Sequence, residues 1–93
     1  TLAGELAAEG ITVNSVLPGY TRTARLEQII EARMATSGQS RAEVEAAMLS
    51  QVPAGRFAEP EEVAAAVAFY ASPAAGYVTG TTLAVDGGRT RAL

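Results

Sequence analysis

The residues with the clearest chemical potential follow a short strand-like segment near the start of the chain. Residues 11–17 alternate in the manner of a β-strand, and the run Pro18-Gly19-Tyr20-Thr21-Arg22-Thr23 comes directly after them. In open α/β sheets, ligands bind just outside the carboxyl ends of the strands. The loop would therefore place backbone amides and two hydroxyls beside a cofactor. We take Pro18, Gly19, Thr21 and Thr23 as the candidate cofactor-binding residues.

Composition excludes several other kinds of chemistry. The chain has no Cys and no His, which removes thiolate sites, the commonest general base and the commonest transition-metal ligand, so we expect no metal site. It has no Lys, its seven Arg are scattered and its net charge is −3, a pattern that argues against nucleic-acid binding. The longest apolar stretch is too short to cross a bilayer, and no signal peptide is visible. We expect a cytoplasmic protein.

Each candidate residue also has an ordinary structural explanation. Pro18-Gly19 could simply be a turn that ends a strand. Thr23 precedes a predicted helix and could act as its N-cap. Arg22 and Arg25 could attract a phosphate-bearing or acidic substrate, or they could be solvated side chains. Tyr20 could touch a substrate or pack within the loop.

The elements that must position the loop can be read from helix and strand signals. We expect Gly19 to adopt backbone angles closed to other residues, and Ile11, Val13, Val16 and Leu17 to be buried. A capping box at Ser40 and Glu43 should open a helix. The predicted helices are 1–9, 24–37, 41–51 and 60–71, and the predicted strands are 11–17 and 82–85, with a turn at Asp86-Gly87-Gly88.

The small number of strands relative to helices predicts that the chain is part of a domain. Two strands are separated by about sixty-five residues that read mostly as helix, and a two-stranded sheet is marginal in water. The apolar strand at residues 11–17 has the character of a central strand that needs partners on both sides. We therefore expect the chain to be part of a larger α/β domain whose other strands lie before Thr1.

Three motifs, in order along the chain, resemble the C-terminal part of a short-chain dehydrogenase/reductase. Residues 11–19 resemble that family's sixth strand and its Asn-x-x-x-Pro-Gly motif, with Thr23 at the position of its downstream Thr. Residues 56–64 are similar to its Arg-Pro-Glu-Glu segment. Thr79-Gly80 and residues 85–88 resemble its last strand and closing turn. Overall the chain looks most like the 3-oxoacyl-(acyl carrier protein) reductase-like members.

The resemblance implies an α/β fold, namely the C-terminal portion of a Rossmann-type doubly wound parallel sheet. Residues 1–93 would form a single partial domain, and residues 24–52 would be a helical lid over the substrate. The activity implied is hydride transfer between NAD or NADP and an alcohol or carbonyl substrate. The backbone near Thr21 and the hydroxyl of Thr23 would meet the carboxamide and the neighbouring phosphate. A homo-oligomer, namely a tetramer, is implied as well.

The chain also departs from the family pattern in ways that concern catalysis. None of its nine Gly forms the family's phosphate-binding turn, and a Tyr-x-x-x-Lys motif cannot exist without Lys. The family's catalytic Ser would lie upstream too, so we assign no catalytic residue to this chain. The alternatives are a non-enzymatic interaction module or an inactive remnant derived from the same fold.

Overall fold

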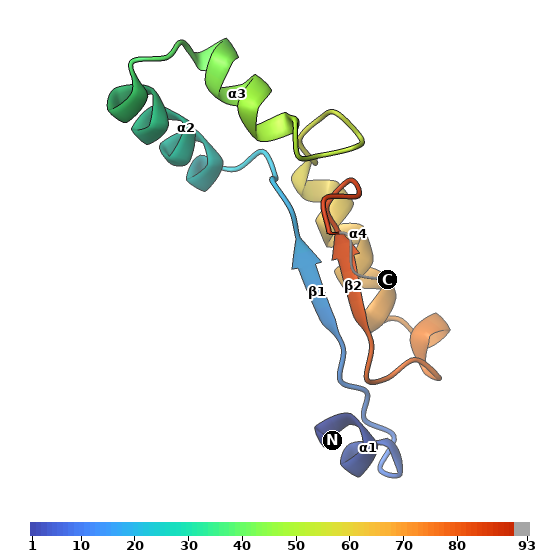
Figure 1. Cartoon of the computed structure of the whole chain (residues 1–93). Helices are drawn as coiled ribbons and strands as arrows, with labels where there is room; N and C mark the ends of the chain where they lie inside the picture. Colours follow the sequence, from blue (N-terminus) through green and yellow to red (C-terminus); the bar gives the residue numbers. More distant parts are fainter. Residues whose placement is uncertain (91–93) are drawn as a thin grey trace.

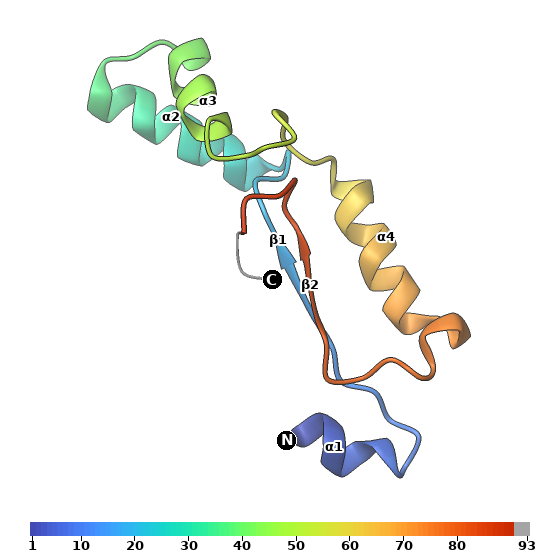
Figure 2. The ribbon, with the colours of Figure 1, turned by 45° about the vertical axis from the view of Figure 1, so that its right-hand side comes forward.

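The computed structural model describes residues 1–90, which form helices at both ends of a short strand pair (Figure 1). In the views of Figures 1 and 2, α1 lies at one end of the strands, α2 and α3 lie at the other, and α4 runs alongside them. The elements are α1 (Leu2–Ala7), β1 (Ser15–Pro18), α2 (Ala24–Ser37), α3 (Arg41–Leu49), α4 (Pro60–Ala71), a 3₁₀ turn (Pro73–Ala75) and β2 (Thr82–Val85).

The two strands pair in parallel, as expected for an α/β fold. Ser15 is opposite Thr82 and Pro18 is opposite Val85, so both strands end at the same edge. The connection between them contains α2, α3 and α4, and α4 contacts both strands. Figure 2 shows α4 along one side of the strand pair. The carboxyl ends of the strands therefore lie next to the start of α4 and the start of α2.

The first strand begins later than the pattern predicts, because side chains make most of its hydrogen bonds before Ser15. One backbone bond remains there, from the Gly80 amide to the Val13 carbonyl at 2.8 Å. The Val13 amide donates to Thr79 Oγ1 (3.0 Å), and the Asn14 side-chain amide donates to the Val78 carbonyl (3.0 Å). Asn14 Oδ1 in turn accepts from the amide and hydroxyl of Thr81, at 3.1 and 2.7 Å. Residues 11–14 are held beside the segment 78–81 without forming a regular strand.

The predicted burial of the first strand is only partly correct. Val13 and Val16 are half-buried, but Ile11 is 45% exposed and Leu17 is 51% exposed. Successive strand residues point to opposite faces of a sheet, so Val16 and Leu17 lie on different faces. Among the described residues only one face of the sheet is covered, which explains why Leu17 is exposed.

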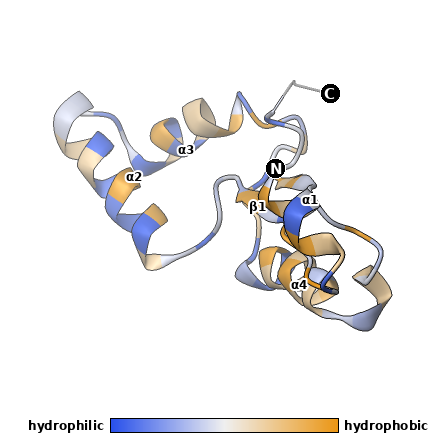
Figure 3. Cartoon of the chain, turned by 90° about the horizontal axis from the view of Figure 1, so that it is seen from below, coloured by the Kyte–Doolittle hydropathy of each residue, from blue (hydrophilic) through white to orange (hydrophobic). Residues whose placement is uncertain are grey.

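The fourth helix is apolar around most of its circumference, yet it has no buried residue. Val67 is 52% exposed and Phe69 is 46% exposed, and Figure 3 shows hydrophobic colour over most of α4. A helix that is hydrophobic all round is normally buried. The surface of α4 is therefore suited to contacts beyond those made within residues 1–90.

Residues 1–90 have the dimensions of an open structure. The radius of gyration is 16.9 Å, whereas a compact domain of this length would have about 12 Å. The accessible surface is 6380 Å², compared with about 5,000 Å² for a compact monomer of this mass. The arrangement of the elements leaves apolar surface that a closed domain would cover.

The main buried cluster lies between α2 and α3 and extends to the loop that follows them. Its buried members are Leu26, Ile30, Val44, Met48 and Phe57. Local signals define the hairpin as predicted: Thr23 caps α2, Gly38 ends it in the left-handed conformation (φ 72°), and the Ser40–Glu43 capping box opens α3. The hairpin is therefore a small packed unit of its own.

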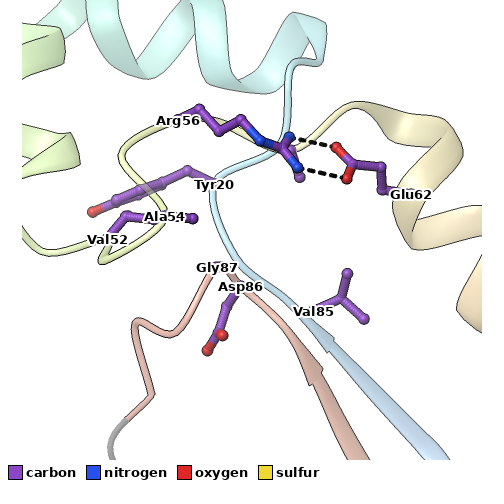
Figure 4. Close-up of a pocket in the computed structure, with 9 residues that line it drawn as sticks. Tyr20, Val52, Ala54, Arg56, Glu62, Val85, Asp86 and Gly87 are labelled. Carbon is purple, nitrogen blue, oxygen red and sulfur yellow. Dashed lines mark hydrogen bonds and ion pairs between the residues drawn. The ribbon is translucent and has the colours of Figure 1, made fainter.

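A bidentate ion pair joins the loop before α4 to the first turn of that helix. Arg56 donates to the two carboxylate oxygens of Glu62 at 2.7 and 2.9 Å (Figure 4), and Glu62 also accepts from the Glu59 amide at 2.9 Å. The Arg56 guanidinium first, and then the Glu59 amide, lower the pKa of Glu62 to about 2. The pair borders a small hollow of about 60 Å³ that Tyr20 and Asp86 also line.

The open shape predicts that residues 1–93, prepared alone, do not unfold as a single cooperative unit. With so little shared core, the α2–α3 hairpin and the strand region should lose structure at different temperatures. Circular dichroism followed through heating, together with small-angle X-ray scattering, measures this. A single sharp transition in a monomer with a radius of gyration near 12 Å, the compact value for this length, would contradict the prediction.

The Arg56–Glu62 pair predicts how the start of α4 responds to pH. Because the folded pKa of Glu62 lies below the usual value, the ionised carboxylate stabilises this junction at neutral pH. That contribution is lost as the pH falls from about 4, the usual Glu pKa, toward the folded value. Titration of the Glu62 carboxyl by NMR should show the low pKa, and Arg56→Gln should raise it.

The matched control is Arg41→Gln, because Arg41 forms the equivalent bidentate pair with Glu27 between α3 and α2. This change should raise the pKa of Glu27 and leave that of Glu62 unchanged. If Glu62 titrated in the usual Glu range, or ignored Arg56→Gln, the junction would not depend on the pair.

Candidate functional site

The four candidate cofactor-binding residues line one hollow of about 400 Å³ at the carboxyl end of β1. Pro18, Gly19, Thr21 and Thr23 all contribute to it. The other walls come from the first turns of α2 and α4. The structure therefore brings together residues that the sequence places in one loop, and it adds two helices that the loop pattern alone could not identify.

Backbone hydrogen bonds hold this loop on two sides. The Gly19 amide donates to the Val85 carbonyl at 3.0 Å, which continues the pairing of the strands past Pro18. Farther along, Thr21 forms a parallel bridge with Ala58. The bridge consists of the Ala58 amide donating to the Tyr20 carbonyl and the Arg22 amide donating to the Ala58 carbonyl, each at 2.9 Å. The loop is thus fixed to the sheet and to the segment that leads into α4.

Gly19 is required for a different reason than the one expected. Within residues 1–90, positive φ angles occur at other glycines, such as Gly87 and Gly88, and Gly19 is not among them. A Cβ atom on Gly19 would instead lie 2.7 Å from the Cβ of Asp86 and 2.8 Å from its Cα. Close approach of the two strand ends is therefore the constraint. The Gly19 amide is also not exposed for a ligand, because it is bonded to Val85.

The hydroxyls of Thr21 and Thr23 each keep some hydrogen-bonding capacity within the described structure. Thr21 donates its hydroxyl proton to the Gly19 carbonyl at 3.0 Å, so its oxygen remains an acceptor. The Thr23 hydroxyl accepts from the Leu26 amide at 3.3 Å, so Thr23 is the N-cap of α2. Its hydroxyl proton remains available. A hydroxyl provides one donor and two acceptor lone pairs. The pair can therefore offer one acceptor and one donor to the same ligand.

The walls opposite the loop are mostly apolar. Leu26 and Ile29 of α2 and Pro60 and Val63 of α4 line the hollow, and among the described residues Arg25 is the one charged residue that lines it. Apolar walls with a few placed polar groups are typical of sites for small organic molecules and cofactors. The lining of this hollow has that composition.

The two arginines near the loop have different surroundings. Arg22 pairs with Glu59 (3.5 Å), and its guanidinium lies 5.4 Å from the centre of the Phe57 ring. Arg25 instead lines the hollow together with Ile29, one helical turn later. Residues four apart on a helix share a face, so the helical spacing carried a signal that could have separated the two arginines.

Tyr20 is mainly a packing residue in this structure. Its ring meets Phe57 edge-on, with centroids 6.1 Å apart, and the Arg89 guanidinium lies 4.5 Å from its centre. It lines both the large hollow and the small one in Figure 4. The contact with Arg89 joins residues far apart in the sequence, so sequence reasoning had no signal for it.

Among residues 1–90, no group of three or more His, Cys, Asp or Glu comes together in a way that could hold a metal ion. Within the same residues, no helix is both long enough and apolar enough to cross a membrane. The groups that line the hollow can form hydrogen bonds and apolar contacts.

Comparison with known sequences supports the family resemblance that the three motifs indicate. A family model described as enoyl-(acyl carrier protein) reductase matches residues 1–90. The 3-oxoacyl-[acyl-carrier-protein] reductase FabG of Haemophilus influenzae is 49% identical over 88 residues, which cover 95% of this chain and 32% of the relative. The chain therefore spans about a third of the length of the curated relatives it matches.

Solved structures agree with this fold. A short-chain dehydrogenase family protein from Francisella tularensis is 33% identical, with a TM-score of 0.91, and the match covers 98% of this chain and 38% of that one. A putative 2-deoxy-D-gluconate 3-dehydrogenase from Agrobacterium tumefaciens, solved with bound NADP, is 43% identical with a TM-score of 0.76, covering 95% and 32%. The chain belongs to the short-chain dehydrogenase/reductase family and corresponds to the C-terminal third of its members.

Proposed function

We propose that this chain supplies the nicotinamide-side loop, the substrate lid and subunit contacts of an NAD(P)-dependent oxidoreductase. The reaction is hydride transfer between the nicotinamide and an alcohol or carbonyl substrate. The polypeptide that precedes this segment in its relatives would supply the catalytic Ser, Tyr and Lys. The observation that carries the proposal is the placement of Pro18, Gly19, Thr21 and Thr23 on one wall of a single hollow.

The free hydrogen-bonding capacity of the two hydroxyls fits a nicotinamide carboxamide. That group presents one acceptor oxygen and one donor nitrogen, which match the remaining proton of Thr23 and the acceptor oxygen of Thr21. The apolar walls suit the face of a ring. When bound, the dinucleotide supplies or accepts the hydride. Thr21 and Thr23 orient the carboxamide, while Pro18 and Gly19 form the floor below it.

The α2–α3 hairpin has the properties that a lid requires. Its buried residues pack mainly against one another, so residues 24–52 can move as a unit. The hairpin connects to the rest of the chain through the candidate loop on one side and residues 53–59 on the other. Leu26 and Ile29 of the hairpin already face the hollow. Closure over a substrate would exclude water from the site.

The exposed apolar surface of α4 is suited to subunit contacts. Val67 and Phe69 are about half exposed on a helix without buried residues. A self-complementary apolar patch is what a two-fold interface needs. The assembled enzyme would be a homotetramer, as the family resemblance implies. A cytoplasmic location stays a prediction.

The alternative function is a non-enzymatic interaction module or an inactive remnant. The same open apolar surface would serve such a protein, because a partner could cover α4 and the bare face of the sheet. The half-used hydroxyls in the hollow favour the enzyme, since a pure interaction module has no need for a matched donor and acceptor there.

Joining this chain to the catalytic part of a relative tests the proposed function. In the joined enzyme, residues 1–90 replace the matching 32% of the Haemophilus influenzae reductase. We expect it to oxidise NADPH or NADH in the presence of a carbonyl substrate, measured at 340 nm. The unaltered relative is the positive control, and the relative truncated before this segment is the negative control. A joined enzyme that unfolds cooperatively yet transfers no hydride would favour the interaction module.

Thr23→Val should weaken cofactor binding in the joined enzyme. Loss of one hydrogen bond is worth about 1 kcal/mol, or about fivefold in Kd. Titration of intrinsic fluorescence or calorimetry with NADPH and NADH measures the change. Thr23→Ser keeps the hydroxyl and should restore binding.

Because Thr23 also caps α2, the helix must be monitored separately. Thr36→Val is the matched control: its hydroxyl donates to the Ala32 carbonyl on the same helix, away from the large hollow. It should leave the cofactor Kd unchanged. Loss of helical circular dichroism in Thr23→Val without any change in Kd would leave Thr23 as a cap alone.

A further inference from the structure

Arg25 is a positively charged residue that lines the largely apolar hollow at the carboxyl end of β1. It lies on the second residue of α2 and lines the hollow beside Leu26 and Ile29, with Pro60 and Val63 across from it. The loop residues Thr21 and Thr23 line the same hollow. Arg25 thus adds a positive charge to a lining that already holds two hydroxyls.

The acidic residues around Arg25 are already paired with other arginines. Glu27, in the same turn, makes a bidentate pair with Arg41 at 2.6 and 2.8 Å. Glu59 pairs with Arg22, and Glu62 pairs with Arg56. Among residues 1–90, no carboxylate lies within salt-bridge distance of Arg25. Its charge is therefore not neutralised by the described part of the chain.

Helix stability does not account for Arg25 either. A positive side chain in the first turn opposes the helix dipole, which favours acidic residues there. Arg41, the first residue of α3, occupies the same kind of position, but it pairs with Glu27 and Glu45. Among residues 1–90, Arg25 thus lies at a position that is unfavourable for the helix, has no carboxylate within salt-bridge distance and lines the hollow. Binding of an anionic ligand would account for these three features.

We propose that Arg25 selects a substrate that carries an anionic group, a carboxylate or a phosphate, next to an apolar segment. This deepens the proposed function, on which it rests, by naming the substrate class. The apolar segment would lie between Ile29 and Val63, and the anion would meet the guanidinium of Arg25. A guanidinium binds such groups through two parallel hydrogen bonds.

A matched pair of carbonyl probes tests the proposal in the joined enzyme. The probes are 4-oxopentanoate and its uncharged methyl ester, which differ in the charge at one end and in the methyl group that removes it. Arg25→Met, which keeps an apolar chain of similar length, should lower kcat/KM for the anion about tenfold or more, because hydrogen bonds between charged groups are strong. It should leave kcat/KM for the ester and the KM for NADPH unchanged.

Arg33→Met is the control variant, because Arg33 lies on the same helix but lines a different hollow. It should alter neither probe's kinetics. An equal loss for both probes in Arg25→Met would mean that Arg25 only packs the wall, and would overturn the proposal. A raised KM for NADPH with an unchanged preference between the probes would assign Arg25 to a cofactor phosphate, which also overturns it.

A binding measurement separates this proposal from the proposed function. In the full 93-residue chain, the side-chain N–H signal of Arg25 should shift on titration with 4-oxopentanoate and not with its methyl ester. An inactive joined enzyme with this shift present would reject the proposed function and keep the anion site. An active joined enzyme that handles both probes alike, with no shift at Arg25, would reject the anion site alone.

Discussion

The close approach of Gly19 and Asp86 is the constraint on which the rest of the structure depends. The two parallel strands end side by side there, and the Gly19 amide donates to the Val85 carbonyl. A side chain on Gly19 would push the strand ends apart. The loop that lines the hollow leaves the sheet at this point. The loop that carries Thr21 and Thr23 therefore begins at a contact that only glycine permits.

The same point also fixes the far end of the α2–α3 hairpin, which we propose as the lid. Past Asp86, the Gly87 carbonyl accepts from the Ala54 amide at 2.9 Å, and a Cβ on Gly87 would lie 2.8 Å from Val52. The hairpin therefore begins at the loop after Gly19 and ends at the segment that contacts Gly87. Phe57, which follows that segment, belongs to the buried cluster of the hairpin, so the packing of the hairpin continues to the strand ends.

Local signals in the sequence predicted the elements best, and long-range contacts limited the rest. Helix α2 begins and ends where Thr23 and Gly38 predict, because N-caps and left-handed glycines act within one turn. The start of β1 could not be predicted, because Asn14 bonds to Val78 and Thr81 across more than sixty residues. The pattern of the loop was enough to identify its four residues as candidates, and the structure brings them to one hollow, while their binding of a cofactor stays a prediction. Helical spacing groups Arg25 with Ile29, whereas the pairing of Arg22 with Glu59 depends on the fold, which brings these two residues together.

The structure is open because its helices and strands each form from local signals, whereas few of them bury one another's apolar side chains. The caps and the hairpin core satisfy α2 and α3 locally, whereas α4 and β1 leave Phe69 and Leu17 about half exposed. Apolar side chains in regular elements are selected for contacts, and relatives of this chain are about three times as long. The hollow behind Pro18 and Gly19 is therefore best understood as one wall of a site. We propose that this wall orients a carboxamide and holds an anion, and that the groups needed for hydride transfer come from the opposite wall.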